Sequence, residues 1–391
     1  MVRIESFSVA GLAGRKTVVN AKLNEDMNVL WGSNGCGKTS LLKILHSALT
    51  NDVKIIKNVP FSRARVKVFD ENLDTFVTKT FDRTVSAKTE TGGKLSPEPD
   101  TDQGEDLANY IRKVIREDEP QWKSIPDLPK SYSMSHGYLS ISRVSERDTR
   151  WYRGSPQQQR VDALDEGSFD QIYATHIQNL WRRYSTEALS KTTIIQRRAL
   201  SQVARTVIER NVSDEDIAEK IDARNAFQAV QAFFKAQNLK PPKTNLSGFI
   251  KHFEQDITFR KIVTDIVSVQ YEVESSSFPV KQIETLLSQL FYGNKTVTLD
   301  RRDLTVRSGD NEVPLYALAS GEKQLLRIFL ECLAAGESCM IIDEPEISLH
   351  VDWQHDLLNY IRLINPKLQV IVATHSPEIM ATLNEDQIFE L

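Results

Sequence analysis

Eight consecutive residues, GSNGCGKT at positions 32–39, combine three glycines with a lysine and a hydroxyl side chain. Glycine allows a tight loop whose successive backbone N–H groups converge on phosphate oxygens, and a following helix adds its positive N-terminal dipole. Lys38 would reach the β- and γ-phosphates of a nucleotide, and Thr39 would bind Mg²⁺ through its hydroxyl. The spacing therefore predicts a phosphate-binding loop. The residues expected to contact the nucleotide are Ser33, Asn34, Gly35, Cys36, Gly37, Lys38, Thr39 and Ser40.

The residues on either side of this loop have the patterns that such a loop requires. MNVLWG, which ends at Gly32, is a short apolar strand pattern, and residues 39–49 repeat apolar side chains at a helical period. An ordinary glycine-rich turn is the alternative interpretation. The strand pattern before the loop and the helix pattern after it favour phosphate binding.

Two acidic residues follow the apolar strand pattern CMII at 339–342. Such a strand end can place the first acid, Asp343, on a Mg²⁺ ion and the second, Glu344, beside the water that attacks a γ-phosphate. Because strands often end in acidic turns, the pattern alone also fits a purely structural turn. Its combination with a phosphate-binding loop favours a catalytic role.

A histidine follows the strand pattern LQVIVAT at 368–374. Ligands bind at the carboxyl ends of strands in α/β sheets, so His375 would hydrogen-bond the γ-phosphate. A single histidine at a strand end is more often structural. Its position 31 residues after Glu344 favours the functional interpretation.

The order and spacing of these motifs resemble the ABC-type ATPase superfamily, and within it the soluble heads of the RecF, SMC/Rad50 and OLD group. The strings DEPEISLH at 343–350 and THSP at 374–377 are typical of that group. The resemblance implies an α/β fold, namely a P-loop NTPase with an ABC-type head and a large, mainly helical insertion. Such a head consists of an α/β core plus an antiparallel β subdomain.

The resemblance also implies ATP and Mg²⁺ as cofactors, with Glu344 and His375 catalytic and with Thr39 and Asp343 at the metal. In this family a signature segment caps the nucleotide held by a second head. That geometry implies a homodimer, or a higher homo-oligomer, in which ATP is sandwiched between heads.

The stretch LYALASGEKQLLRIF, which starts at residue 315, lies where the family has this signature segment. Its helix would aim an N-terminal dipole at a phosphate of the neighbouring subunit. Ala319 stands where the family usually has serine, so Ser320 or backbone N–H groups must make the contact. By position, the signature residues are Ser320, Gly321 and Glu322, and the residues of the family's D-loop are Ser348, Leu349 and His350.

Strand and helix patterns alternate at both ends of the chain, whereas its middle is mainly helical. We therefore expect an ATP-binding head at 1–155 and 292–391 and an insertion lobe at 156–291. Residues 86–106 are polar and rich in Gly, Pro and Thr, which predicts a mobile loop. Further expected elements are helices from Ser213 to Phe234, at 247–270 and at 280–291, and a hairpin turn at 309–311.

The composition is that of a cytoplasmic protein with no membrane attachment. Lys and Arg number 49 against 53 Asp and Glu, a net charge of −4, so the whole chain has no basic excess that indicates nucleic-acid binding. The three cysteines have no metal-site spacing, and the N-terminus lacks the apolar core of a signal peptide.

Three features leave alternatives open. Residues 181–210 hold seven basic and two acidic side chains, which fits either a contact with nucleic acid or an acidic partner, or a solvated helix face. Arg143, in GYLSISRV, is a candidate for the family's Q-loop position. Arg15 is a candidate adenine contact, because no aromatic residue before the phosphate loop suits that role.

The expected function is a switch ATPase that controls a separate effector. Only 16 residues follow His375, too few for the nuclease domain that OLD-type proteins append. Stand-alone heads of this kind resemble ATPases of the bacterial anti-phage systems Septu, PARIS and retrons, whose partner is a nuclease or another toxic effector. The alternative is a RecF- or Rad50-like ATPase of DNA repair or chromosomes that binds DNA directly. A transporter subunit is disfavoured by the long gap between phosphate loop and signature.

Overall fold

A computed structural model describes residues 1–83, 120–129, 131–140, 166–209, 221–236 and 240–391. The chain divides into two compact units, one of residues 1–177 and 313–391 and the other of Gln178–Glu312. The expected mobile loop at 86–106, the helix start at Ser213 and the Q-loop candidate Arg143 lie outside the described residues.

The first unit contains an antiparallel sheet with the strand order β2-β1-β4-β5-β6. Side chains along β1, β4 and β5 alternate between buried and partly exposed positions, as expected for strands with one face on a core. The strands are β1 Val2–Ala10, β2 Val18–Lys22, β4 Arg63–Asp70, β5 Thr75–Asp82 and β6 Lys123–Ile125.

A second sheet of the same unit is parallel throughout, with the order β13-β3-β12-β11-β7. Every residue of β11 and β12 is buried, because elements cover both faces of the sheet. The strands are β3 Met27–Trp31, β7 His136–Leu139, β11 Cys339–Asp343, β12 Gln369–Thr374 and β13 Ile388–Glu390.

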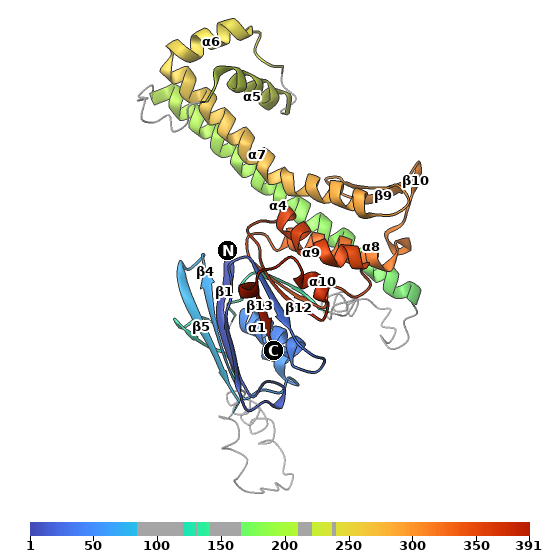
Figure 1. Ribbon diagram of the computed structural model, residues 1–391. Coiled ribbons are helices and arrows are strands. Elements are labelled where there is room, and N and C mark those ends of the chain that lie inside the picture. The colour runs from blue at the N-terminus through green and yellow to red at the C-terminus, as the bar shows by residue number, and fades with distance from the viewer. Residues whose placement is uncertain (84–119, 130, 141–165, 210–220, 237–239) are drawn as a thin grey trace, which may run out of the picture. The chain divides into compact units, whose positions relative to one another are not determined.

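Helix α1, Lys38–Thr50, lies between the two sheets (Figure 1). Its apolar side chains share one core with β1, β4 and β5 and with alternate residues of β11 and β12. The other helices of this unit are α8 Ser320–Ala334, α9 Val351–Ile364 and α10 Pro377–Met380, with short 3-10 turns at Leu12–Gly14, Val53–Ile56, Leu315–Ala317 and Glu385–Gln387. These two sheets and their helices confirm the α/β fold with an antiparallel β subdomain.

The second unit is mainly helical. Aromatic and aliphatic side chains of α5, α6 and α7 form its core, with Phe249 and Phe253 buried near Val263. Helix α4 begins in the first unit and continues into this one. The elements are α4 Glu166–Glu209, α5 Ala223–Ala236, α6 Leu246–Gln255, α7 Ile257–Leu290, β8 Lys295–Leu299, β9 Leu304–Ser308 and β10 Asn311–Glu312.

Two details of the second unit differ from the expected elements. The helix break lies at Asp256, whose carboxylate accepts a hydrogen bond from the N–H of Phe259 at 3.1 Å and starts α7 there. Helix α7 then runs through Pro279, so the predicted separation between 270 and 280 was wrong. The hairpin turn predicted at 309–311 is confirmed between β9 and β10.

The unit boundaries at 178 and 312 also differ from the expected insertion limits at 156 and 291. Side chains of α7 bond the backbone of β8, because Ser288 accepts from the N–H of Val297 and Glu284 accepts from that of Leu299. The sheet of β8, β9 and β10 therefore packs against the helices of this unit.

A buried glutamine joins the two sheets of the first unit. The side chain of Gln369, on β12, accepts a hydrogen bond from the N–H of Ile4 at 2.7 Å. Its amide nitrogen donates to the carbonyl oxygens of Ile4 at 2.9 Å and of Asn24 at 2.8 Å. Since Gln369 is only 1% exposed, these three backbone groups have little access to water as a replacement.

We expect Gln369→Leu to lower the free energy of unfolding by about 2–4 kcal/mol, because buried backbone groups lose their partners. Urea unfolding followed by circular dichroism measures the change. The control is Gln255→Leu, at an exposed position at the end of α6. A variant at 369 as stable as this control would contradict the role of the glutamine.

Candidate functional site

The predicted phosphate loop connects β3 to α1 and has the backbone that its glycines allow. Gly35 and Gly37 have φ angles of 80° and 102°, in the region that favours glycine. A Cβ at Gly37 would also lie 3.2 Å from side-chain atoms of Leu12 and Ala13. Ser33, Asn34 and Gly35 form an exposed tip, Cys36 and Lys38 are buried, and Gly37, Thr39 and Ser40 are partly buried.

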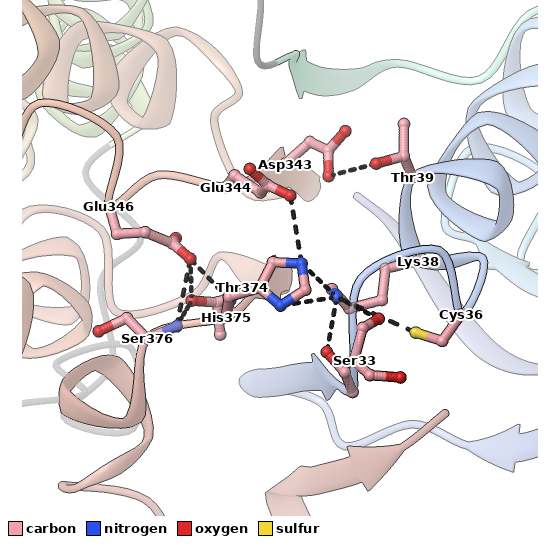
Figure 2. Close-up of polar contacts among 11 residues, drawn as sticks. Ser33, Cys36, Lys38, Thr39, Asp343, Glu344, Glu346, Thr374, His375 and Ser376 are labelled. Atoms are coloured by element: carbon pink, nitrogen blue, oxygen red, sulfur yellow. Dashed lines mark hydrogen bonds and ion pairs between the residues drawn. The ribbon is translucent and has the colours of Figure 1, made fainter.

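The side chain of Lys38 extends from the start of α1 to the loop backbone and to His375. Its Nζ donates to the carbonyl oxygen of Gly32 at 2.8 Å and lies 2.7 Å from Nε2 of His375 (Figure 2). The other ring nitrogen, Nδ1, lies 3.3 Å from the same ammonium group. Glu344 Oε1 lies 3.5 Å from Nε2 of this ring. The lysine, the histidine and the second acid therefore converge.

Asp343, the first of the two acids, contacts Thr39 of the phosphate loop. Thr39 Oγ1 donates to Asp343 Oδ1 at 3.2 Å. Burial raises the pKa of Asp343 to about 6, an effect that nearby Glu344 increases, whereas the Thr39 hydrogen bond and the charges of Lys43 and Lys38 oppose it. A hydroxyl and a carboxylate oxygen are hard donors of the kind that Mg²⁺ prefers.

These two oxygens fit a Mg²⁺ ion that also binds phosphate. Mg²⁺ at nucleotide sites uses one or two protein groups together with phosphate oxygens and water. In the described ranges no group of three or more His, Cys, Asp or Glu could hold a metal ion without such help. The residue types at positions 39 and 343 are therefore suited to a nucleotide-linked metal.

Glu344 has a strained backbone at the end of β11. Its φ angle of 47° is uncommon for a residue with a side chain, and such conformations occur often at functional sites. The N–H of Glu344 donates to the carbonyl oxygen of Ala373 at 2.8 Å, which ties the turn to β12. This turn brings the carboxylate near His375 (Figure 2).

Glu346 is a site residue that the sequence analysis did not single out. Its Oε1 accepts hydrogen bonds from the Oγ1 of Thr374 and the N–H of His375, each at 2.7 Å, and from the N–H of Ser376 at 3.2 Å. The residue was visible in the string DEPEISLH, but its partners lie 28 to 30 residues further along the chain. No local pattern indicates such a pairing.

The predicted signature residues form the start of α8. Ala319 is the N-cap residue, and its N–H donates to the carboxylate of Glu322 at 3.0 Å. Glu322 is 2% exposed, and its carboxylate caps the N-terminus of α8. Ser320, in contrast, is exposed. A Cβ at Gly321 would lie 2.7 Å from the carbonyl oxygen of Ser348. The signature and D-loop segments of one chain therefore touch, and only glycine fits at 321.

The remaining candidates have less defined surroundings. Arg15 follows the 3-10 turn Leu12–Gly14, whose side chains lie against Gly37. Within the basic stretch, Arg182 forms an ion pair with Asp303 at 2.9 Å. Most of its other basic side chains are exposed on α4, namely Arg183, Lys191, Arg197, Arg198 and Arg205. No helix in the described part of the chain is long and apolar enough to cross a membrane.

A profile of the AAA ATPase domain matches residues 3–380. The "Retron Vc95 probable ATPase" of Vibrio cholerae serotype O1 biovar El Tor is 29% identical over 99 residues, which are 22% of this chain and 19% of that protein. The "Septu protein PtuA" of Bacillus thuringiensis is 28% identical over 107 residues, or 23% of this chain and 27% of that protein. The chain thus spans between 19% and 27% of these relatives.

A solved Smc head domain with an extended coiled coil, from Pyrococcus furiosus, aligns with 100% of this chain and 93% of its own, at 14% identity and a TM-score of 0.43. The profile of the AAA ATPase domain covers nearly the whole sequence, including the loop, the acidic strand end and the histidine that meet at one sheet edge. The chain therefore belongs to the AAA ATPase domain family, and parts of it are similar to a retron probable ATPase and to a Septu protein.

Proposed function

We propose that the protein binds ATP together with Mg²⁺ at the loop of residues 32–40 and hydrolyses it to ADP and phosphate. The observation that carries this proposal is the convergence of Lys38, Thr39, Asp343, Glu344 and His375 at one edge of the parallel sheet. A basic residue, two acids, a hydroxyl and an imidazole are the groups that phosphoryl transfer needs.

Binding would use the loop amides and Lys38. The ammonium of Lys38 exchanges the ring of His375 for phosphate oxygens, while the amides of residues 33–40 donate to the α- and β-phosphates. Thr39 Oγ1 and Asp343 would hold Mg²⁺, which would supply positive charge to the phosphate groups. The exposed tip at 33–35 is accessible for this contact.

Glu344 would act as the general base. Its Oε1 accepts a proton from a water molecule as the water oxygen bonds the γ-phosphorus and the bond from phosphorus to the bridging oxygen of ADP breaks. His375, released from Lys38, holds the γ-phosphate by a hydrogen bond. The strained backbone of Glu344 keeps its carboxylate next to this histidine.

The signature segment would act on a second copy of the chain. Ser320 is exposed at the N-terminus of α8, where the helix dipole favours a phosphate group. The D-loop residues Ser348 and His350 are exposed beside it. We propose that ATP bound to one head is capped by this surface of another, so that nucleotide controls assembly of a homodimer or higher oligomer in the cytoplasm.

The cycle would control a separate effector, a nuclease or toxin, in anti-phage defence. Partial similarity to proteins named as retron ATPases and as a Septu protein supports this assignment. In it, the unit of residues 1–177 and 313–391 would act as the ATP-binding head, and the unit Gln178–Glu312 would be the region available to the partner.

Lys38→Ala should weaken ATP binding at least about tenfold, because a charge-assisted bond to phosphate is lost. Equilibrium titration with a fluorescent ATP analogue measures the affinity. Lys54→Ala removes the same charge at an exposed position outside the loop and should leave affinity unchanged. Full affinity in the Lys38 variant would refute the phosphate-loop assignment.

Asp343→Asn should stabilise the protein at neutral pH when nucleotide and divalent cations are left out. The pKa of Asp343 is raised to about 6 from an ordinary value of 3.8, so the folded state holds more protons between these limits. Stability is therefore lost as the pH rises through this range, and removing the charge restores about 1–3 kcal/mol above pH ~6.

Urea unfolding of wild type and Asp343→Asn at several pH values measures this difference. It should be largest at neutral pH and disappear near pH ~4, where the wild-type carboxyl is protonated in both states. Asp352→Asn, with a side chain 78% exposed, provides the control. An Asp343→Asn variant that is no more stable at neutral pH would contradict the prediction.

Glu344→Gln should bind ATP but hydrolyse it about 10²–10⁴-fold more slowly, since the amide cannot accept the proton of water. ATP-bound dimers should then accumulate on size-exclusion chromatography with ATP and Mg²⁺. Glu385→Gln, at an exposed position, serves as the matched control. A variant that binds ATP and yet stays monomeric would overturn the sandwich proposal.

A further inference from the structure

Glu346 joins two loops that each carry a proposed catalytic residue. Its Oε1 accepts from the hydroxyl of Thr374 and from the backbone N–H groups of His375 and Ser376 (Figure 2). The other oxygen, Oε2, is buried, and no described residue gives it a hydrogen bond. One oxygen of a charged group is thus directed at three consecutive residues centred on the histidine.

A second chain of hydrogen bonds supports the same loop. The Oγ1 of Thr374, a fully buried residue, accepts from the N–H of Ser376 at 2.9 Å. The hydroxyl of Ser376 donates to the side chain of Gln354 on α9 at 2.8 Å, and that amide donates to the carbonyl oxygen of Leu349 at 2.9 Å. The loop after β12 is therefore held from the loop after β11 and from α9.

The position of the His375 ring depends on its backbone. The ring lies 2.7 Å from Lys38 and 3.5 Å from Glu344, and both residues would turn to substrate and water during the reaction. The bonds from Glu346 to the main chain do not involve those groups. Charge-assisted bonds from a carboxylate are stronger than neutral ones, so they can fix this backbone while the ring changes partners.

We propose that Glu346 is a positioning residue for ATP hydrolysis, which acts through His375 and does not touch the nucleotide. The inference rests on the function proposed above. Glu346 also lies two residues after Glu344, so the base and the histidine are held by one short turn. A movement of the D-loop, residues 348–350, would shift both groups together.

The test is a double-mutant cycle in the full-length protein. Glu346→Ala should lower kcat by up to about a hundredfold with little change in KM, because the histidine is misplaced while the phosphate loop is intact. Glu346→Gln should retain more activity, because its amide oxygen can accept the same three hydrogen bonds. In a His375→Ala background, Glu346→Ala should cause no further loss. An equal loss in both backgrounds would overturn the proposal.

A second measurement is independent of hydrolysis. Amide hydrogen exchange of the peptide that contains residues 374–376, without nucleotide, should be faster in Glu346→Ala than in wild type. Glu378→Ala is the control, since it removes a half-exposed carboxylate just after this loop whose ion pair is with His355. Unchanged exchange in Glu346→Ala would overturn the inference even if the protein hydrolyses ATP.

The two measurements separate this inference from the proposed function. Faster exchange in a protein that does not hydrolyse ATP would refute the ATPase proposal and leave the anchoring of the loop established. Hydrolysis by wild type with losses that add in the double mutant would support the ATPase proposal and refute the positioning role.

Discussion

The parallel pairing of β3, β12 and β11 is the constraint on which the site depends. Trp31 pairs with Thr374, and Ala373 pairs with Asp343, so the loops that follow all begin at the same edge of the sheet. Lys38 and His375 meet there although 337 residues separate them. A shift of one residue in this register would turn Asp343 toward the opposite face, away from Thr39.

The site gathers charges that would be costly to bury singly. Lys38 is 5% exposed and Asp343 is 2% exposed. Lys38 contacts the imidazole of His375, and Asp343 accepts a hydrogen bond from the hydroxyl of Thr39. The raised pKa of Asp343 shows that this compensation is incomplete. Strongly shifted pKa values occur often at functional sites.

Local patterns in the sequence were sufficient for the α/β class and for the strand and helix that flank the loop, whereas the roles of the loop, the acidic strand end and the histidine stay predictions. Local patterns failed at the bounds of α7, which begins at Ile257 after its N-cap residue Asp256 and continues through Pro279. The partners of Glu346 lie 28 to 30 residues away and depend on the three-dimensional arrangement, whereas the bond between Ala319 and Glu322 spans only three residues at the start of a helix.

The contact between Gly321 and the carbonyl oxygen of Ser348 has a consequence for association. There is no room for even a methyl group between Gly321, at the start of α8, and the carbonyl oxygen of Ser348, so the two segments are in close contact. In the proposed dimer, a second head that contacts the start of α8 would therefore also contact residues 348–350. If the proposed association of heads occurs, the entropy of ordering that surface is already lost when the chain folds, which would lower the free-energy cost of binding.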